Sequence, residues 1–330
     1  MVLAGDVGGT NARLATVELN GGAARIVRKS RYASGDYPGL APIVRHFVEE
    51  GGDLPDRACF AIACPVVGDD CTAPNLPWTV NARALAADIG IPRTAIMNDF
   101  VAVGYGIELL LPSDLATLQE GAAAPQGPIA LIGAGTGLGQ GFLIWQGDRY
   151  RVLASEGGHG DYALSGELQS GLLQSLRRQF GRVSWERLLS GPGLVNIYRY
   201  LLAGGVEPEQ PTVHDEMEKE DPARVISRHG LARTDCLSVR ALDLFCEIFG
   251  AQAGNLALTV VATGGVYLAG GIAPQIVERL QSGPFMTAFR NKGRLSALLS
   301  RIPVHVILNP NIGVLGAAAV AGRLTETVSS

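Results

Sequence analysis

The feature that constrains the fold most is a repeated arrangement of strand, glycine-rich turn and strand. The apolar run Val2–Val7 leads into the turn GDVGGTN at residues 5–11, and an alternating stretch, Arg13–Leu19, follows it. The arrangement returns later, where Ile129–Ile132 precedes GAGTGLGQG and Phe142–Trp145 follows it. We expect a β-hairpin at each place, because two strands joined through a glycine turn pair in antiparallel fashion. The repetition predicts that the two halves of the chain share one architecture.

Strands and helices alternate around these hairpins. Apolar residues recur at helical spacing from Leu40 to Val48, which predicts an amphipathic helix. A long helical pattern runs from Cys236 to Val261. Further elements are a helix capped by Asn81 and reaching Asp88, a glycine- and alanine-rich helix over Pro310–Arg323, and strands over Ile26–Ala33, Phe60–Val67, Thr94–Met97 and Val266–Ala269. This order predicts mixed β-sheets with helices packed on them, the α/β class.

Two segments carry little periodic pattern. Residues 112–128, PSDLATLQEGAAAPQGP, are rich in Pro, Gly and Ala, and we interpret them as a loop at a domain boundary. Seven acidic residues gather between Glu207 and Asp221. We interpret this cluster as a solvated loop or helix face.

Composition excludes several classes of protein. A chain of 330 residues with 47% hydrophobic and 18% charged residues is typical of a globular protein of roughly two domains. The net charge is −4 and no block of Lys and Arg occurs, so we expect neither nucleic acid nor an anionic membrane as partner. No apolar run is long enough to span a membrane, and no basic segment precedes the first apolar residues. We therefore expect a cytoplasmic protein.

The five cysteines show no spacing typical of a zinc site. They are Cys59, Cys64, Cys71, Cys236 and Cys246, and most have apolar neighbours. We expect reduced, mostly buried thiols.

The first glycine turn has features of a phosphate site. It lacks the G-K-[S/T] ending of a Walker A loop, and a strand follows it where a dinucleotide fingerprint has a helix. Glycines tolerate positive φ and let a phosphate approach backbone N–H groups, while Thr10 and Asn11 add side-chain donors. Asp6 would repel a phosphate unless Mg²⁺ stood between them, held directly or through water. A plain hairpin with an exposed aspartate is the alternative, but a second turn of the same kind favours a grip on a polyphosphate.

Seven motifs in one order carry a resemblance to a known family. GDVGGTNAR, IACPVVGD, NDFVAVG, GAGTGLG, EGGH, LSGPGLVNIYR and AGGI, from residue 4 to about residue 317, resemble bacterial glucokinases of the hexokinase type, within the actin-like ATPase superfamily. The resemblance implies two α/β domains of one duplicated, ribonuclease H-like topology, with a cleft between them. It places the C-terminal helix with the small domain, which gives residues 1–110 plus 305–330 as the small domain and 111–304 as the large one.

The resemblance also implies the site residues. ATP-binding residues would be Gly5, Asp6, Val7, Gly8, Gly9, Thr10, Asn11, Gly133, Gly135, Thr136, Gly137, Gly270 and Gly271, with Asp6 serving Mg²⁺. The sugar contacts would be Asn98, Asp99, Glu156, His159 and Glu186. A related branch of sugar kinases and repressors carries a cysteine-rich zinc motif after its EGGH-like histidine. No cysteine follows His159 here, so we expect no structural zinc.

The expected reaction is transfer of the γ-phosphoryl group of ATP to the 6-hydroxyl of glucose, the first step of glycolysis. Asp99 follows a buried strand, at the sheet edge where ligands gather in open α/β folds, and its carboxylate would take the hydroxyl proton. Asn98 and Asp99 could instead only cap the next helix. Likewise His159 could be a satisfied structural residue, and Glu186 could only stabilise a helix N-terminus.

Three other functions remain open at this point. An actin-like ATPase would hydrolyse ATP without sugar and act on a protein partner. A sugar-sensing repressor would need a DNA-binding segment before GDVGGTN, where only four residues stand. A kinase for another hexose, such as mannose, would use the same residues. The resemblance suggests a homodimer.

Overall fold

The computed structural model describes residues 1–51, 54–64, 66–72 and 76–324. Their contacts divide the chain into two compact units. The first unit holds residues 1–114, residues 150–154 and the C-terminal segment from Asn309, and the second holds residues 115–149 and 155–308. Each unit is described by itself below.

The first unit is built on a five-stranded sheet with the order β3-β2-β1-β4-β8. Antiparallel pairing joins β1 to β2 and β2 to β3, whereas β1, β4 and β8 run parallel. The strands span Val2–Val7 (β1), Asn11–Asn20 (β2), Ala23–Ala33 (β3), Arg57–Ile62 (β4) and Arg93–Asn98 (β8). All five strands were predicted; the ends of β1 are as predicted, and those of β2, β3 and β8 differ by a few residues. The predicted strand over residues 60–67 is wrong in extent, because β4 ends at Ile62, and Pro65 lies outside the described residues.

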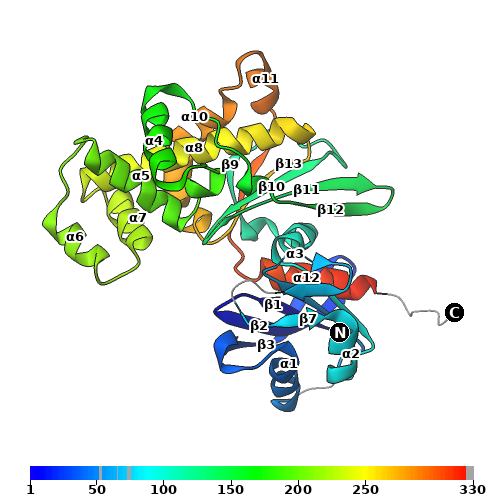
Figure 1. Cartoon of the computed structure of the whole chain (residues 1–330). Helices are drawn as coiled ribbons and strands as arrows, with labels where there is room; N and C mark the ends of the chain where they lie inside the picture. Colours follow the sequence, from blue (N-terminus) through cyan, green and yellow to red (C-terminus); the bar gives the residue numbers. More distant parts are fainter. Residues whose placement is uncertain (52–53, 65, 73–75, 325–330) are drawn as a thin grey trace. The chain divides into compact units, whose positions relative to one another are not determined.

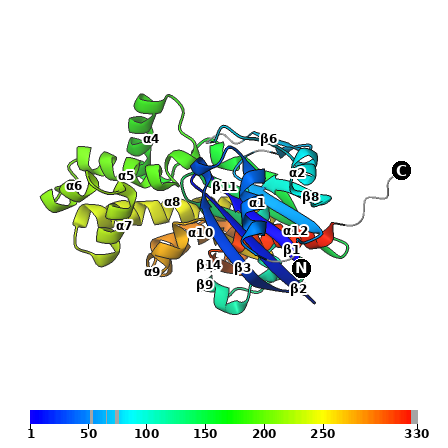
Figure 2. The ribbon, with the colours of Figure 1, turned by 90° about the horizontal axis from the view of Figure 1, so that it is seen from below.

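Helices cover both faces of this sheet, so the first unit has three layers (Figures 1 and 2). Successive side chains of a strand point to opposite faces. Leu3 therefore joins a core with the helices α1 (Leu40–Glu49) and α2 (Ala82–Ile89), while Ala4 faces a second core. The second core packs against α3 (Asp99–Gly106) and α12 (Ile312–Arg323). Short 3₁₀ turns lie at Ser34–Asp36, Ile107–Leu109 and Pro112–Asp114.

A small three-stranded sheet follows β4. It consists of β5 (Val66–Val67), β6 (Asp70–Thr72) and β7 (Thr79–Asn81) in sequence order. The β5–β6 hairpin turns the chain back, and Cys64 and Cys71 form a disulfide. The expectation of five reduced thiols is therefore wrong for this pair. Two cysteines seven residues apart gave no sign in the sequence that a hairpin would bring them together.

The second unit repeats the strand order of the first. Its six-stranded sheet runs β12-β11-β10-β13-β14-β9, with β10 and β11 antiparallel and β10, β13 and β14 parallel. The strands span Leu115–Gln119 (β9), Ile129–Ala134 (β10), Leu138–Gln146 (β11), Arg149–Ser155 (β12), Gly265–Ala269 (β13) and Val304–Ile307 (β14). Residues 150–154 of β12 group with the first unit. The duplication of architecture expected from the two glycine hairpins is confirmed.

The interpretation of residues 112–128 as a loop is wrong at Leu115–Gln119. This segment forms the edge strand β9, antiparallel to β14. The Gln119 side chain is buried, and its amide donates to the carbonyls of Leu299 and Ile302. Contacts so distant in the chain outweigh the weak local strand pattern.

Helices complete the second unit around α8, the longest helix described, whose buried side chains form much of the core. The helices are α4 (Gly166–Phe180), α5 (Gly191–Ala203), α6 (Pro211–Met217), α7 (Pro222–Ala232), α8 (Cys236–Val260), α9 (Val277–Gln281), α10 (Pro284–Arg290) and α11 (Ser296–Leu299). Short 3₁₀ turns are η4 (Gly157–His159), η5 (Trp185–Arg187), η6 (Ala273–Ile276) and η7 (Gly293–Leu295). The acidic cluster of residues 207–221 contains α6, so it is a largely exposed helical segment.

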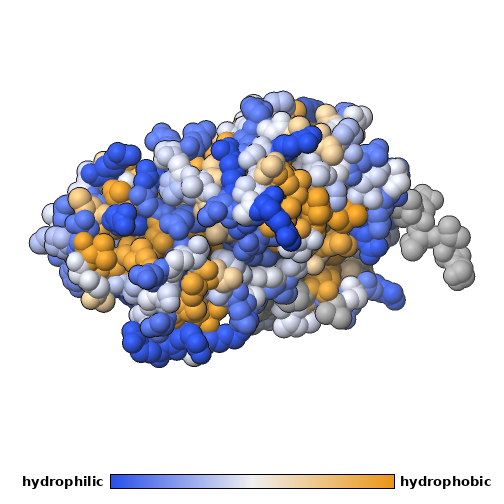
Figure 3. Space-filling view, turned by 90° about the horizontal axis from the view of Figure 1, so that it is seen from above, coloured by the Kyte–Doolittle hydropathy of each residue, from blue (hydrophilic) through white to orange (hydrophobic). Residues whose placement is uncertain are grey.

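Apolar residues on the face shown in Figure 3 form separate patches among hydrophilic ones. Among the residues described, no helix combines the length and the apolar character needed to span a membrane.

Candidate active site

The first glycine turn, between β1 and β2, is held by its own backbone and by one serine. The Gly8 N–H donates to the Asn11 carbonyl at 2.9 Å. The buried Ser34 donates its hydroxyl to the Gly8 carbonyl at 2.8 Å and its N–H to the Thr10 carbonyl at 3.0 Å. Thr10 is exposed, and the Asn11 side-chain oxygen accepts from Arg31 Nε at 2.8 Å. The backbone carbonyls of the turn are thus held by Ser34.

Asp6 ends up beside Arg13 because the two residues are opposite one another in the β1–β2 register. Arg13 Nη1 lies 3.2 Å from Asp6 Oδ2. Burial raises the pKa of the Asp6 carboxyl above 3.8, and Arg13 opposes this shift. On the other side, the N-terminal turn of α12 covers the carboxylate, since a Cβ at Gly313 would stand 3.2 Å from Asp6 Cγ. A half-buried carboxylate of this kind fits one Mg²⁺ contact, with phosphate oxygens and water as the remaining ligands.

The second glycine turn, between β10 and β11, is hydrogen-bonded to the start of α5 and to η5 of the same unit. The Gly135 N–H donates to the Gly137 carbonyl at 2.9 Å, and the Gly191 N–H at the start of α5 donates to the Gly135 carbonyl at 2.8 Å. The Leu138 N–H donates to Glu186 Oε2 at 3.0 Å. Thr136 is exposed at the tip.

A pocket of about 450 Å³ opens beside this turn, entirely within the second unit. Gly135 and Thr136 line it from the turn, and Gly271 lines it from the end of β13. Its other walls come from the first residues of α5, from α7 and from η6, with Asp221, Arg224, Ser227 and Gln275 as polar groups. A size of this order is usual for small-molecule sites. The sequence analysis assigned none of these four residues to a site; the one sequence signal available was the start of a helix at Asp221-Pro222.

The glycines act differently from the expectation. Neither turn holds a glycine in the left-handed region. Among the glycines expected at the site, Gly270 alone has a left-handed φ, 81°, and a Cβ there would also collide with the Ala134 backbone. Gly5, Val7 and Gly133 are buried within β1 and β10, so they position the turns. A Cβ at Gly5 would meet Phe60 at 2.6 Å. In the turns themselves, a Cβ at Gly137 would stand 2.5 Å from Glu186 Oε2, whereas Gly8 and Gly135 have room for one.

Asn98 and Asp99 stand at the carboxyl end of β8, where α3 begins. Asn98 Oδ1 accepts from the N–H groups of Phe100 and Val101, and Asn98 Nδ2 donates to the Cys64 carbonyl at 3.0 Å. Asn98 is thus the helix cap that the alternative reading proposed. Because an amide NH₂ has two hydrogens, one donor remains for a ligand. Asp99 Oδ1 accepts from Phe100 N–H at 2.8 Å, which fixes the carboxylate at the strand end.

Glu156, His159 and Glu186 come together within the second unit. His159 Nε2 lies 3.9 Å from Glu156 Oε2, and His159 Nδ1 lies 3.8 Å from Glu186 Oε1. Glu156 and His159 are well exposed, whereas the Glu186 side chain is one-third exposed. The 3₁₀ turn η4 carries His159, and η5 carries Glu186. The three side chains present hydrogen-bonding groups at one place, which suits a ligand with several hydroxyls.

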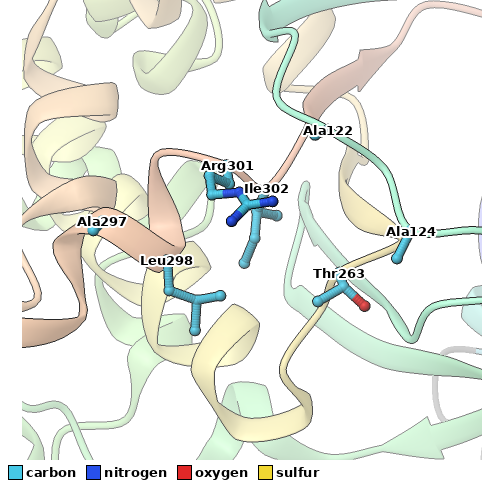
Figure 4. A pocket seen from close by; sticks show the side chains of 7 residues that line it. All are labelled: Ala122, Ala124, Thr263, Ala297, Leu298, Arg301 and Ile302. Carbon is cyan, nitrogen blue, oxygen red and sulfur yellow. The ribbon is translucent and has the colours of Figure 1, made fainter.

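A second pocket, of about 440 Å³, holds none of the expected site residues. Figure 4 shows its lining by Ala122, Ala124, Thr263, Ala297, Leu298, Arg301 and Ile302. No carboxylate lines it, so it offers no group to activate a hydroxyl.

Comparison with known proteins shows that the chain is similar to glucokinases over nearly its whole length. The sequence pattern of the glucokinase family matches residues 3–324. A glucokinase from Nostoc sp. is 44% identical over 340 aligned positions, covering 98% of this chain and 99% of that protein. The chain belongs to the glucokinase family. A crystal structure of glucokinase from an Antarctic psychrotroph matches with a TM-score of 0.87 and 30% identity over 98% of both chains.

Membership of the glucokinase family confirms the resemblance seen in the motifs and the expected actin-like ATPase fold. A ROK family glucokinase from Streptomyces griseus shares this fold at a TM-score of 0.65 and 21% identity, over 98% of this chain and 99% of that one. That glucokinase was crystallised with glucose and AMPPNP.

Proposed function

We propose that the chain transfers the γ-phosphoryl group of MgATP to the 6-hydroxyl of glucose, yielding glucose 6-phosphate and ADP. The observation that carries this proposal is the pocket bounded by Gly135, Thr136 and Gly271, because residues of two separate glycine motifs line one cavity of nucleotide size. Family membership supports the sugar as acceptor.

On the donor side, ATP would place its nucleoside in this pocket and its phosphates against the turn at residues 135–137. The turn at Gly8, Gly9, Thr10 and Asn11 would offer further phosphate contacts, and Asp6 would hold Mg²⁺ through one carboxylate oxygen or through water. The metal would neutralise charge on the phosphates. Phosphoryl transfer asks the protein mainly for positioning and electrostatic stabilisation.

On the acceptor side, glucose would be bound by Glu156, His159 and Glu186 together with Asn98 and Asp99. The Asp99 carboxylate would accept the proton of the 6-hydroxyl as that oxygen attacks phosphorus. The Phe100 N–H on Oδ1 would keep the carboxylate oriented during this step. Asn98 would direct its remaining N–H to a sugar hydroxyl.

We propose further that the protein is a cytoplasmic homodimer that supplies glucose 6-phosphate to glycolysis; the family resemblance is its support. The same resemblance supports a small domain of residues 1–110 plus 305–330 and a large domain of residues 111–304. Residues 325–330 of the small domain lie outside the described residues. The two compact units support this division.

The test is a coupled assay of ADP release with ATP and Mg²⁺, in the presence of glucose, mannose or no sugar. We expect release that depends on glucose and exceeds that with mannose at least tenfold. Equal release without sugar would instead establish an actin-like ATPase, and a preference for mannose would establish a kinase for that hexose.

A further inference from the structure

The Glu186 carboxylate connects the second glycine turn to the acceptor residues. Its Oε2 accepts from the Leu138 N–H at 3.0 Å, while its Oε1 lies 3.8 Å from His159 Nδ1. One oxygen is thus engaged by the phosphate-binding turn, and the other faces the sugar-binding histidine. A hydrogen bond to an ionised carboxylate is among the stronger hydrogen bonds in proteins.

The absence of a side chain at residue 137 makes this contact possible. A Cβ on Gly137 would stand 2.5 Å from Glu186 Oε2, closer than real Cβ atoms approach other atoms. At Gly135, in the same turn, a Cβ would meet nothing nearer than the Gly271 N at 3.9 Å. Neither glycine has a left-handed φ, so the two positions differ in their neighbours and not in backbone strain.

The surrounding segments hold Glu186 in a fixed frame. The buried Ser190 donates its hydroxyl to the Glu186 carbonyl at 2.7 Å. The Trp185 N–H donates to the carbonyl of Gly160, the residue after His159, at 3.0 Å. The Gly158 backbone packs against the Leu138 carbonyl with no room for a Cβ. The turn, the Glu186 segment and the His159 loop are therefore in mutual contact, and a shift of one displaces the others.

We propose that Glu186 is a positioning residue for the phosphate-binding turn in addition to a sugar contact, so that sugar and nucleotide each bind more tightly when the other is present. A sugar hydroxyl on Oε1 fixes the carboxylate, and Oε2 then holds the Leu138 N–H and the turn in place for phosphate. Such coupling between two ligands is reciprocal. The proposal rests on the proposed function, since it takes glucose and ATP as the two ligands.

The first test uses Gly137→Ala with Gly135→Ala as its matched control. Glucose affinity is measured by calorimetry without nucleotide. We expect Gly137→Ala to weaken glucose binding about tenfold, equivalent to about 1.4 kcal/mol, although residue 137 belongs to the phosphate turn. Gly135→Ala is expected to bind glucose within about twofold of the wild type. Equal glucose affinity in the two variants overturns the proposal.

The second test measures the ratio of glucose dissociation constants without and with AMPPNP. We expect a ratio of about five or more in the wild type and about one in Glu186→Ala. His159→Ala should bind glucose more weakly yet keep the wild-type ratio. A wild-type ratio retained in Glu186→Ala overturns the proposal, even where Gly137→Ala fails to fold. A wild-type protein that does not bind glucose at all contradicts the proposed function itself, which distinguishes the two failures.

Discussion

The crossing of α3 and α12 leaves no space for a side chain at Gly316, which predicts the effect of Gly316→Ala. A Cβ at this position would stand 2.5 Å from the Ala102 carbonyl carbon and 2.9 Å from the Gly106 N, with the Ala102 carbonyl oxygen closer than either. Real Cβ atoms keep at least 3.0 Å from such neighbours, and because the carbonyl oxygen is the nearest of them, the two helices must separate by well over the roughly 0.5 Å that the carbonyl carbon alone requires. Because backbone atoms cannot rotate away, we expect the overpacking to lower the free energy of unfolding by about 3 kcal/mol, the upper end of the usual range.

Alanine is the better helix former by about 1 kcal/mol, so the net loss of stability is about 2 kcal/mol. For a unit of this size that corresponds to a melting temperature about 4–8 °C lower, measurable by scanning calorimetry. Activity should fall as well, since Asp99 is the first residue of the displaced α3.

The matched control is Gly322→Ala in the same helix, where a Cβ would meet only the flexible end of Leu19. We expect this variant to melt within about 2 °C of the wild type, since the helix propensity gained offsets a small rearrangement. A Gly316→Ala protein with the melting temperature of the wild type would show that the helix crossing has room for a Cβ at residue 316.

Two further predictions concern Cys64–Cys71 and Asp6. Under denaturing conditions without reductant, thiol titration should find three groups, Cys59, Cys236 and Cys246, and five after reduction; five without reductant would contradict the disulfide. Burial raises the pKa of Asp6, so its ionisation destabilises the fold as pH rises through 3.8 and beyond. The melting temperature of Asp6→Asn should therefore exceed that of the wild type at pH 7, and the difference should be smaller near pH 4. The kcat of the variant should fall about a hundredfold. Equal melting temperatures at both pH values would show that the carboxylate carries no burial cost.

Strong local patterns predicted most of the fold. The period-two strands around each glycine turn and the helical spacing from Leu40 to Val48 fixed the element types, and repetition of the turn indicated the duplicated sheet order. Asn81 caps its helix as predicted, with its side chain accepting from Arg83 and Ala84. These features depend on neighbours in the sequence, so the sequence alone reveals them.

Features that depend on distant contacts were missed. The strand β9 is specified by pairing with β14, almost two hundred residues later, and the disulfide by a hairpin too short to show a pattern. The sequence singled out Glu186 as a sugar contact but gave no sign of its bond to the Leu138 N–H, and the tolerance of glycine for positive φ is not used in either turn. Which contact makes a glycine necessary is decided by tertiary packing.

Asp99→Asn is the direct test of whether the Asp99 carboxylate accepts the proton of the glucose hydroxyl. The assay compares kcat from coupled ADP release with the glucose dissociation constant from calorimetry, in the variant and the wild type. We predict that kcat falls about 10²- to 10⁴-fold while glucose binds within about threefold of the wild type, because the amide keeps the shape and loses the base. A variant with kcat near that of the wild type would show that Asp99 is not the base.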